Sequence, residues 1–202
     1  KKTTAPAAVT PVSGTITEKA RSTRVVQTCD VCVLGGSCTG VFAAVRAAQM
    51  GAKVALVEKQ NAFGGVATSG LVAIWHRLKD RKNKKTIIGG LTRTMIERLA
   101  KIDACSTKVV GRSCSINTEE LKIELDKLVL DHDITPYLHT SYASPLIEGD
   151  KIKAVFIENK NGRQAIVAKV FVDATGDGDL ARDIGIPFEI RKGLQPPTTC
   201  SD

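Results

Sequence analysis

The sequence predicts an α/β fold, with a parallel β-sheet, flanking helices and an antiparallel β-meander. Residues 28–58 run from a short β-branched stretch through a glycine-rich turn and an alanine-rich segment to a second β-branched stretch. This pattern is typical of a strand, a helix and a strand in a parallel sheet. Residues 143–170 hold three short β segments separated by turn sequences, which indicate antiparallel hairpins. At 202 residues the chain can form one good-sized domain with a sizeable core.

The first strand, helix and strand follow one another closely. The first strand is expected at residues 31–34, and the helix covers about 41–50. Gly51 stands where the helix end favours a positive φ. The second strand is expected at 54–57, with Glu58 at its carboxyl end.

The turn between the first strand and the helix follows the spacing G-x-G-x-x-G, except that Ser37 takes the middle glycine position. A glycine permits the tight turn, and the helix N-terminus directs free N–H groups at a pyrophosphate. An acid about 20 residues on accepts hydrogen bonds from ribose hydroxyls, and Glu58 fits that place. Ser37 either tilts aside or donates to a phosphate; a tightly packed helix in an ordinary α/β domain is the alternative. The residues expected at the pyrophosphate are Gly35, Gly36, Ser37, Cys38, Thr39 and Gly40.

A second glycine-rich stretch, FGGVATSG, follows the second strand and is too rich in glycine for a regular helix. Together with VCVLGGSCTG and the pair Glu58-Lys59, it resembles the flavoproteins with two dinucleotide-binding domains, the FAD-dependent oxidoreductase family. The resemblance implies an FAD-binding Rossmann-like parallel sheet with an inserted antiparallel β-meander. It also implies that the second stretch lies along the FAD pyrophosphate and ribitol, through Gly64, Gly65, Ala67 and Thr68.

A third candidate stretch, DATGDGD, follows an apolar strand and precedes a helix expected to be capped by an aspartate. In the resembled family this run touches FAD, which implies that role for Thr175, Gly176 and Asp177. The alternatives are an acidic turn that caps a helix, or a cation site formed by Asp177 and Asp179. The resemblance also places the adenine near residues 141–143.

The remaining elements follow from periodicity and capping signals. Apolar residues at helical spacing predict a helix over 91–99, and a second helix starts at Asn117 or Thr118 and runs to about His132. Residues 135–140 are expected to form the third parallel strand, beside the first. The meander strands are expected at 143–147, 151–158 and 164–170.

The cysteines and histidines suggest no firm chemistry. Cys29 and Cys32 form a C-x-x-C pair, but positions three apart on a strand point to opposite faces, which disfavours a redox pair. Cys105 and Cys114 flank a loop and could pair, although free thiols are the favoured interpretation. His76 follows the second glycine stretch and could face substrate, but a structural or solvent-facing role is favoured. No zinc-type spacing is present, and no metal is predicted.

Charge and composition exclude other classes. The net charge of +8 comes from scattered basic residues without interleaved aromatics, which disfavours a nucleic-acid platform. No apolar run reaches membrane-spanning length. Residues 1–27 are expected to be a flexible basic arm, 28–190 the FAD-binding domain with a meander at 142–170, and 191–202 the start of a missing or separate C-terminal region. The chain begins at Lys1 rather than Met, so the basic arm is expected to remain after a segment is removed. This weakly favours an exported or periplasmic protein.

The predicted function is an FAD-dependent oxidoreductase that transfers a hydride between a small-molecule substrate and the flavin. No catalytic acid or base can be named from the sequence. An NAD(P)-dependent dehydrogenase would share the first glycine turn but not the two later motifs. A non-catalytic FAD-binding chain, completed by a second chain or a C-terminal domain, is the other alternative.

Overall fold

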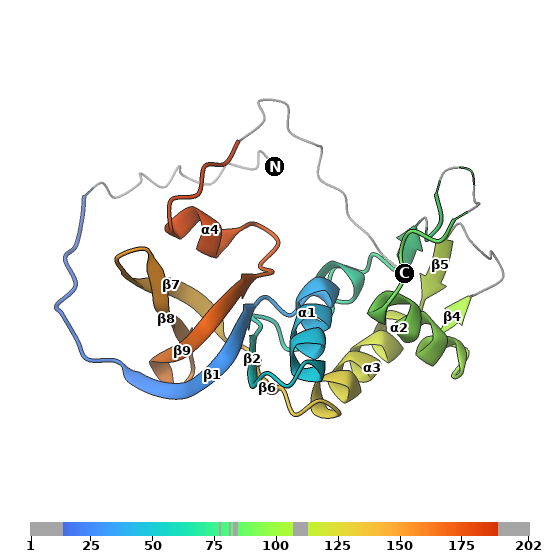
Figure 1. Ribbon diagram of the computed structural model, residues 1–202, viewed down its shortest axis with the longest axis horizontal. Helices are drawn as coiled ribbons and strands as arrows, with labels where there is room; N and C mark the ends of the chain where they lie inside the picture. Colours follow the sequence, from blue (N-terminus) through green and yellow to red (C-terminus); the bar gives the residue numbers. More distant parts are fainter. Residues whose placement is uncertain (1–13, 77, 81, 83–84, 107–112, 190–202) are drawn as a thin grey trace, which may run out of the picture.

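The computed structural model describes residues 14–76, 78–80, 82, 85–106 and 113–189, and these form two sheets with helices packed on them (Figure 1). The larger sheet has six strands in the order β6-β2-β1-β9-β8-β7 within the described residues. Its strands are β1 (Arg24–Leu34), β2 (Val54–Val57), β6 (Thr135–Tyr137), β7 (Ser141–Glu148), β8 (Lys151–Asn159) and β9 (Gly162–Asp173).

The parallel part of this sheet is centred on β1. That strand pairs in parallel with β2 on one side and with β9 on the other, from Arg24 opposite Gln164 to Leu34 opposite Asp173. The third predicted parallel strand, β6, lies beside β2 at the edge of the sheet. Its expected place beside β1 was wrong, because the 12-residue β9 occupies that whole side of β1.

The predicted meander is confirmed as antiparallel, with β7 paired to β8 and β8 to β9. It continues the main sheet, because β9 is at once the last meander strand and the parallel neighbour of β1. The carboxyl ends of β2, β1 and β9 therefore lie next to one another at one edge of the sheet.

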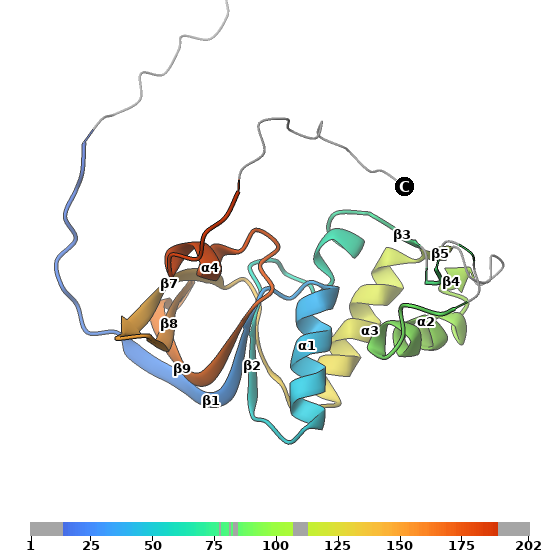
Figure 2. The same cartoon turned by 45° about the horizontal axis from the view of Figure 1, so that its top comes forward.

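Four helices and a short 3₁₀ turn flank the sheets in the described part of the chain. They are α1 (Cys38–Gln49), α2 (Leu91–Ala100), α3 (Thr118–Leu130), α4 (Asp179–Asp183) and the 3₁₀ turn Gly65–Ala67. The smaller antiparallel sheet has the order β3-β5-β4, formed by β3 (Ile74–His76), β4 (Cys105–Ser106) and β5 (Ser113–Ile116). Figures 1 and 2 show α1 and α3 side by side, and α4 near the meander strands.

The core consists of two buried clusters, one on each face of the main sheet. The first joins Val33 and Leu56 to the inward sides of α1, α2 and α3. The second joins Leu34 and Val57 to β8, β9 and Leu180 of α4. Side chains alternate between the faces of a strand, so β1 and β2 supply residues to both clusters. The strands at the centre are therefore buried on both sides, as their apolar runs predict.

Local signals correctly placed the start of α3 and the end of α1. The Asn117 side chain accepts hydrogen bonds from the N–H groups of Glu119 and Glu120, at 3.0 and 3.2 Å, so it caps α3 as predicted. Gly51, after α1, has a φ of 87° as expected.

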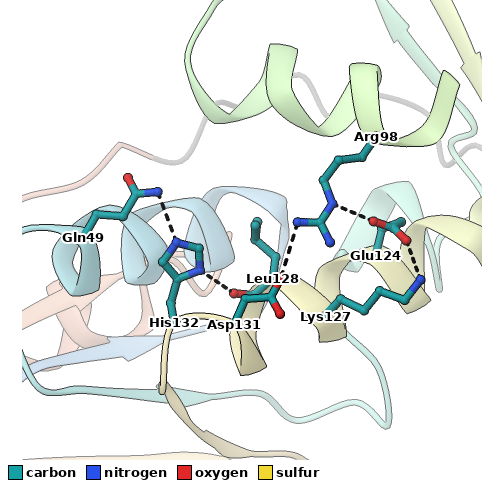
Figure 3. A network of polar contacts seen from close by, with 7 residues as sticks. All are labelled: Gln49, Arg98, Glu124, Lys127, Leu128, Asp131 and His132. Carbon is teal, nitrogen blue, oxygen red and sulfur yellow. Dashed lines mark hydrogen bonds and ion pairs between the residues drawn. The ribbon is translucent and has the colours of Figure 1, made fainter. Parts of the chain in front are cut away.

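A charge network holds α2 on α3 (Figure 3). The Glu124 carboxylate on α3 is buried and accepts hydrogen bonds from Arg98 of α2 at 2.6 Å and from Lys127 at 2.7 Å. Burial alone would raise the pKa of Glu124, but the hydrogen bonds from Lys127 and Arg98 outweigh it, so its pKa is lowered. Arg98 also pairs with Asp131 at 3.6 Å. The ion pairs thus fix the position of the helical layer.

The same layer is tied at its far end by a histidine. His132 lies just beyond the end of α3; its Nδ1 is 2.9 Å from the carbonyl oxygen of Leu128, and its Nε2 is 3.2 Å from Gln49 of α1 (Figure 3). These contacts give His132 a structural role.

The cysteines behave differently from the expectation. Cys105 and Cys114 are joined by a disulfide between β4 and β5, so the prediction of free thiols at these positions was wrong. Cys29 and Cys32 are free thiols that pack into one buried cluster. The expectation of opposite faces fails because the N–H groups of Asp30 and Val31 both donate to the Lys53 carbonyl, which breaks the alternation of β1. Burial raises the pKa of both thiols, which does not favour redox reactivity.

The first strand begins before the predicted start of the FAD-binding domain at residue 28. Residues 14–23 form no helix or strand, and β1 starts at Arg24, within the predicted arm. Residues 1–13 of that arm and residues 191–202 lie outside the described residues. Among the residues that the structure describes, no helix has the length and apolar character needed to cross a membrane.

Candidate cofactor-binding site

A cleft of about 710 Å³ lies at the carboxyl edge of the main sheet, where β2, β1 and β9 end. Ligands of open parallel sheets bind at this edge, and the volume is within the usual range for small-molecule sites. Three chain segments line it, one after each of these strands, and the corner between β6 and β7 adds a fourth wall. The lining residues are Gly35, Ser37, Val57, Glu58, Lys59, Gln60, Gly65, Val66, Ser69, Gly70, Thr140, Ser141, Tyr142, Ala174, Thr175, Gly176, Asp177 and Asp179.

The first glycine turn is packed so closely that side chains cannot replace its hydrogens. Gly35 has a φ of 98°, and a Cβ there would lie 2.8 Å from the Thr175 nitrogen. A Cβ on Gly36 would lie 2.8 Å from the Glu58 Cβ, and one on Gly40 would collide with the Gly35 carbonyl oxygen. The glycines therefore bring the backbone of three segments together beneath the cleft, which is the cradle that the spacing predicted.

The N-terminus of α1 opens into this cradle. Ser37 caps the helix, because its hydroxyl accepts from the Gly40 N–H at 3.4 Å, and it also lines the cleft. Helix geometry leaves the N–H groups of Cys38 and Thr39 without intrahelical partners, and no acid stands in the first turn. This end of the helix is therefore suited to an anion.

The Cys38 side chain has a packing role. Its thiol donates to the Gly64 carbonyl oxygen at 3.7 Å, and burial raises its pKa to about 11. At neutral pH it is therefore a protonated thiol that fills space beneath the second glycine stretch.

Glu58 reaches the cleft with its carboxylate already held by the backbone. Its side chain is 6% exposed; Oε2 accepts from the Gly36 N–H at 2.6 Å and Oε1 from the Gln60 N–H at 2.7 Å. Each carboxylate oxygen can accept a second hydrogen bond. Lys59 and Gln60 follow on the cleft rim. The carboxylate is therefore fixed in place and still able to accept from hydroxyl groups.

The second glycine stretch lies directly on the first. The Gly64 N–H donates to the Gly36 carbonyl oxygen at 2.8 Å, and Gly65 lines the cleft beside Ser37. Ala67 and Thr68, in contrast, are buried, and neither lines the cleft. The Thr68 hydroxyl donates to the Phe63 carbonyl oxygen at 2.7 Å. These two side chains support the loop from behind, whereas the resemblance had implied a place along the cofactor for them.

The third segment follows β9 and carries Thr175, Gly176 and Asp177 on the cleft wall. The Thr175 hydroxyl donates to Asp173 at 2.7 Å and accepts from the Gly178 and Asp179 N–H groups at 3.0 and 3.1 Å. The residue capping α4 is Gly178, so the expectation of an aspartate cap was wrong. In the described residues no group of three or more potential metal ligands gathers, at this turn or elsewhere.

Several lining residues were not predicted as site residues. Val66, Ser69 and Gly70 extend the second glycine stretch, and Tyr142 joins the cleft from the start of β7. The Tyr142 hydroxyl donates to Asp183 of α4 at 3.0 Å, and burial and that carboxylate raise its pKa. The glycine-rich sequence could have indicated the first group, and Tyr142 lies within residues 141–143, where the resemblance had placed the adenine.

The candidate substrate histidine lies elsewhere. His76 is the last residue of β3, where it is exposed and pairs with Ser113, and it does not line the cleft. Its favoured solvent-facing role therefore agrees with its position.

Three solved structures with a similar fold are each a longer chain than this one. A geranylgeranyl bacteriochlorophyll reductase-like protein from Thermoplasma acidophilum matches with a TM-score of 0.56 and 18% identity, over 79% of this chain and 42% of that one. THI4 from Thermovibrio ammonificans matches with a TM-score of 0.57 and 16% identity, over 78% of this chain and 61% of that one. A p-nitrophenol 4-monooxygenase from Pseudomonas putida matches with a TM-score of 0.55 and 10% identity, over 79% of this chain and 44% of that one. At these identities the likeness shows the fold, and the chain spans only part of each relative.

Comparison with curated protein sequences found no match. A family model described as FAD dependent oxidoreductase matches residues 30–200, most of the chain. The cleft fits the cofactor in that description, because the glycine cradle leaves no room for a Cβ, the α1 N-terminus suits a diphosphate, and Glu58 can accept from ribose hydroxyls. The alternative of an NAD(P)-dependent dehydrogenase is not supported by this match. The chain belongs to the FAD dependent oxidoreductase family, and its cofactor is FAD.

Proposed function

We propose that this chain provides the FAD site of an oxidoreductase that passes a hydride between a small-molecule substrate and the flavin. The observation that carries the proposal is the order of chemical groups along the cleft. The adjacent strands β2, β1 and β9 bring Glu58, the α1 N-terminus, and then Asp177 with Asp179 to one edge. Carboxylates suit hydroxyl groups, and a helix N-terminus suits phosphate.

That order matches the order of groups in FAD. Glu58 would accept from the adenosine ribose, and the N–H groups of Cys38 and Thr39 at the start of α1 would hold the pyrophosphate. The backbone N–H groups of Gly35, Gly36 and Gly40 already have partners, so these glycines and Ser37 would shape the turn around it. Gly65, Thr175, Gly176 and Asp177 would lie along the ribitol side, and Lys59 on the rim near the adenosine. Of the other residues expected in contact, Gly64, Ala67 and Thr68 would act by supporting that wall.

FAD supplies the hydride-accepting chemistry when it is bound, and the residues of this chain bind and orient it. The exposed Val66, at 67%, stands on the cleft rim next to Gly65 and would face the space where a substrate arrives. No cleft-lining residue in the described part of the chain is a histidine or a cysteine.

A second candidate function is supported by the lack of histidine and cysteine among the described cleft-lining residues and by the share of the solved relatives that this chain spans. The chain spans 42% to 61% of the three solved relatives described above. A chain that binds FAD but turns over only with a second chain or a further domain would show the same cleft. The two candidates differ in whether bound FAD is reduced by substrates without an added partner.

The first test is the absorption spectrum of the purified 202-residue chain, before and after acid precipitation, with FAD added during refolding. Bands near about 375 and 450 nm that move to the supernatant would establish non-covalent FAD. The variant Gly40→Ala is the matched control, because its Cβ would collide with the backbone of the cradle. Colourless wild-type protein that also fails to bind added FAD would refute the proposal. Bound FAD that a panel of amines, alcohols and hydroxy acids cannot reduce would favour the non-catalytic candidate.

A further inference from the structure

Asp173 ends β9 directly beside the first glycine turn, yet it does not line the cleft. It stands opposite Leu34 in the parallel register, and the next N–H, of Ala174, donates to the Leu34 carbonyl oxygen at 2.7 Å. The chain then turns through Thr175, and a Cβ on Gly35 would lie 2.8 Å from the Thr175 nitrogen. The turn over residues 174–179 therefore rests on the backbone that forms the cradle.

The Asp173 carboxylate binds both ends of this turn. Oδ1 accepts from the N–H of Thr175 at 3.1 Å and from its hydroxyl at 2.7 Å. Oδ2 accepts from the Ala181 N–H in α4 at 3.0 Å. One side chain thus joins the start of the turn to the helix that follows it.

The Thr175 hydroxyl connects Asp173 to the later part of the turn through hydrogen bonds. It donates to Asp173 and accepts from the N–H groups of Gly178 and Asp179, at 3.0 and 3.1 Å. A hydroxyl has one proton and two acceptor positions, so all of its capacity is used. The hydroxyl is therefore not available to a cofactor, and Gly176 and Asp177 line the cleft beside it.

The turn needs these hydrogen bonds because its two glycines neither restrict the backbone nor supply a side-chain cap for α4. Gly176 and Gly178 have φ values of 90° and 72°, and Gly178 has no side chain to cap α4. The helix has five residues, which is too short to be stable without outside contacts. Burial would raise the pKa of Asp173, but the hydrogen bonds from Ala181 and Thr175 outweigh it and lower the pKa. The carboxylate is therefore charged at neutral pH and accepts strongly.

We propose that Asp173 is a positioning residue for FAD: through Thr175 it fixes the turn over residues 174–179 in the shape that contacts the ribitol side of the cofactor. The proposal deepens the proposed function and rests on it. Asp173 itself does not touch the cofactor.

The test measures FAD affinity of the 202-residue chain by fluorescence titration at 10 °C, in Asp173→Asn, Thr175→Val and the double variant. Each single variant should weaken binding about tenfold, the effect of losing one hydrogen bond to a charged group. The double variant should be no more than about twofold weaker than the worse single variant, because both changes break one linked set. Thr175→Ser keeps the hydroxyl and should bind as the wild type does. Asp126→Asn removes an exposed carboxylate from α3, which packs on α1 and α2, and should also leave the affinity unchanged.

Losses that multiply to about a hundredfold in the double variant would overturn the proposal, and so would unchanged binding in Asp173→Asn. A second readout uses the chain without FAD. Amide hydrogen exchange at Gly178, Asp179 and Ala181 should be faster in Asp173→Asn than in the wild type, with exchange in α3 unchanged. If the wild-type chain binds no FAD, the proposed function fails. Exchange then decides the role of Asp173 by itself, and equal rates at these three amides would refute it.

Discussion

The substitution Glu58→Gln separates what this carboxylate does for the fold from what it does for the cofactor. In the wild type, two backbone N–H groups donate to Glu58, from Gly36 at 2.6 Å and from Gln60 at 2.7 Å. A glutamine keeps one carbonyl oxygen, so one of the two N–H groups must face its NH₂. A hydrogen bond to a charged group contributes about 1.5–3 kcal/mol, and this is the expected loss in free energy of unfolding. In a domain of this size, the loss lowers the melting temperature by about 3–12 °C.

The assay is thermal unfolding of the FAD-free chain by circular dichroism, followed by an FAD titration well below the melting temperature. Glu148→Gln is the matched control, since Glu148 is exposed and its ion pair with Lys153 is 3.7 Å long, so its removal should change the free energy of unfolding by less than about 0.5 kcal/mol. FAD affinity of Glu58→Gln should fall about tenfold, because a neutral amide replaces the charged acceptor of the ribose hydroxyls. A melting temperature equal to that of the control variant would refute the backbone role, and an unchanged affinity would refute the ribose contact.

Three further variants test the rest of the structure. Gly40→Ala should abolish FAD binding while the protein keeps its helical circular dichroism, since the added Cβ collides with the cradle; normal binding would contradict the packing described. Arg98→Met leaves buried Glu124 with one partner and should lower the free energy of unfolding by about 1–3 kcal/mol at pH 7. Because the folded-state pKa of Glu124 is lowered, this difference should be present above about pH 4.3 and vanish as the pH falls through that lowered pKa. Urea unfolding at pH 7 and pH 3 measures it, and an equal loss at both values would exclude the ion pair as the cause. The double variant Cys105→Ser with Cys114→Ser should lose about 2–3 kcal/mol, the loop-closure value for this spacing, and dithiothreitol should destabilise the wild type but not the variant.

The parts of the fold that sequence alone predicted are those governed by neighbouring residues. The strand, turn and helix from 31 to 50, the positive φ of Gly51 and the cap at Asn117 each depend on contacts within a few positions. The antiparallel meander was likewise predicted from short turns between β segments. Local chemistry decides such features, so a single sequence contains the information.

What the sequence did not predict depends on segments far apart in the chain. The place of β6 beside β2 follows from β9 filling the other side of β1, which no local pattern indicates. Thr68 was assigned to the cofactor from its motif, but packing buries its side chain against Phe63. Asp173 was read only as the start of the DATGDGD run, although its carboxylate organises the whole turn.

The pairing of β1 with β9 also bears on how the protein folds. These strands pair from Arg24 to Leu34, with one register shift between Val25 and Gln27, although about 140 residues separate them in the sequence. Closing so large a loop is entropically costly, so the central pairing of the sheet is expected to form late and slowly. During synthesis, the glycine cradle would emerge from the ribosome long before the turn at 174–179 that completes the cleft. Cofactor loading is therefore expected to follow completion of this segment, with the early strand–helix–strand unit exposed until then.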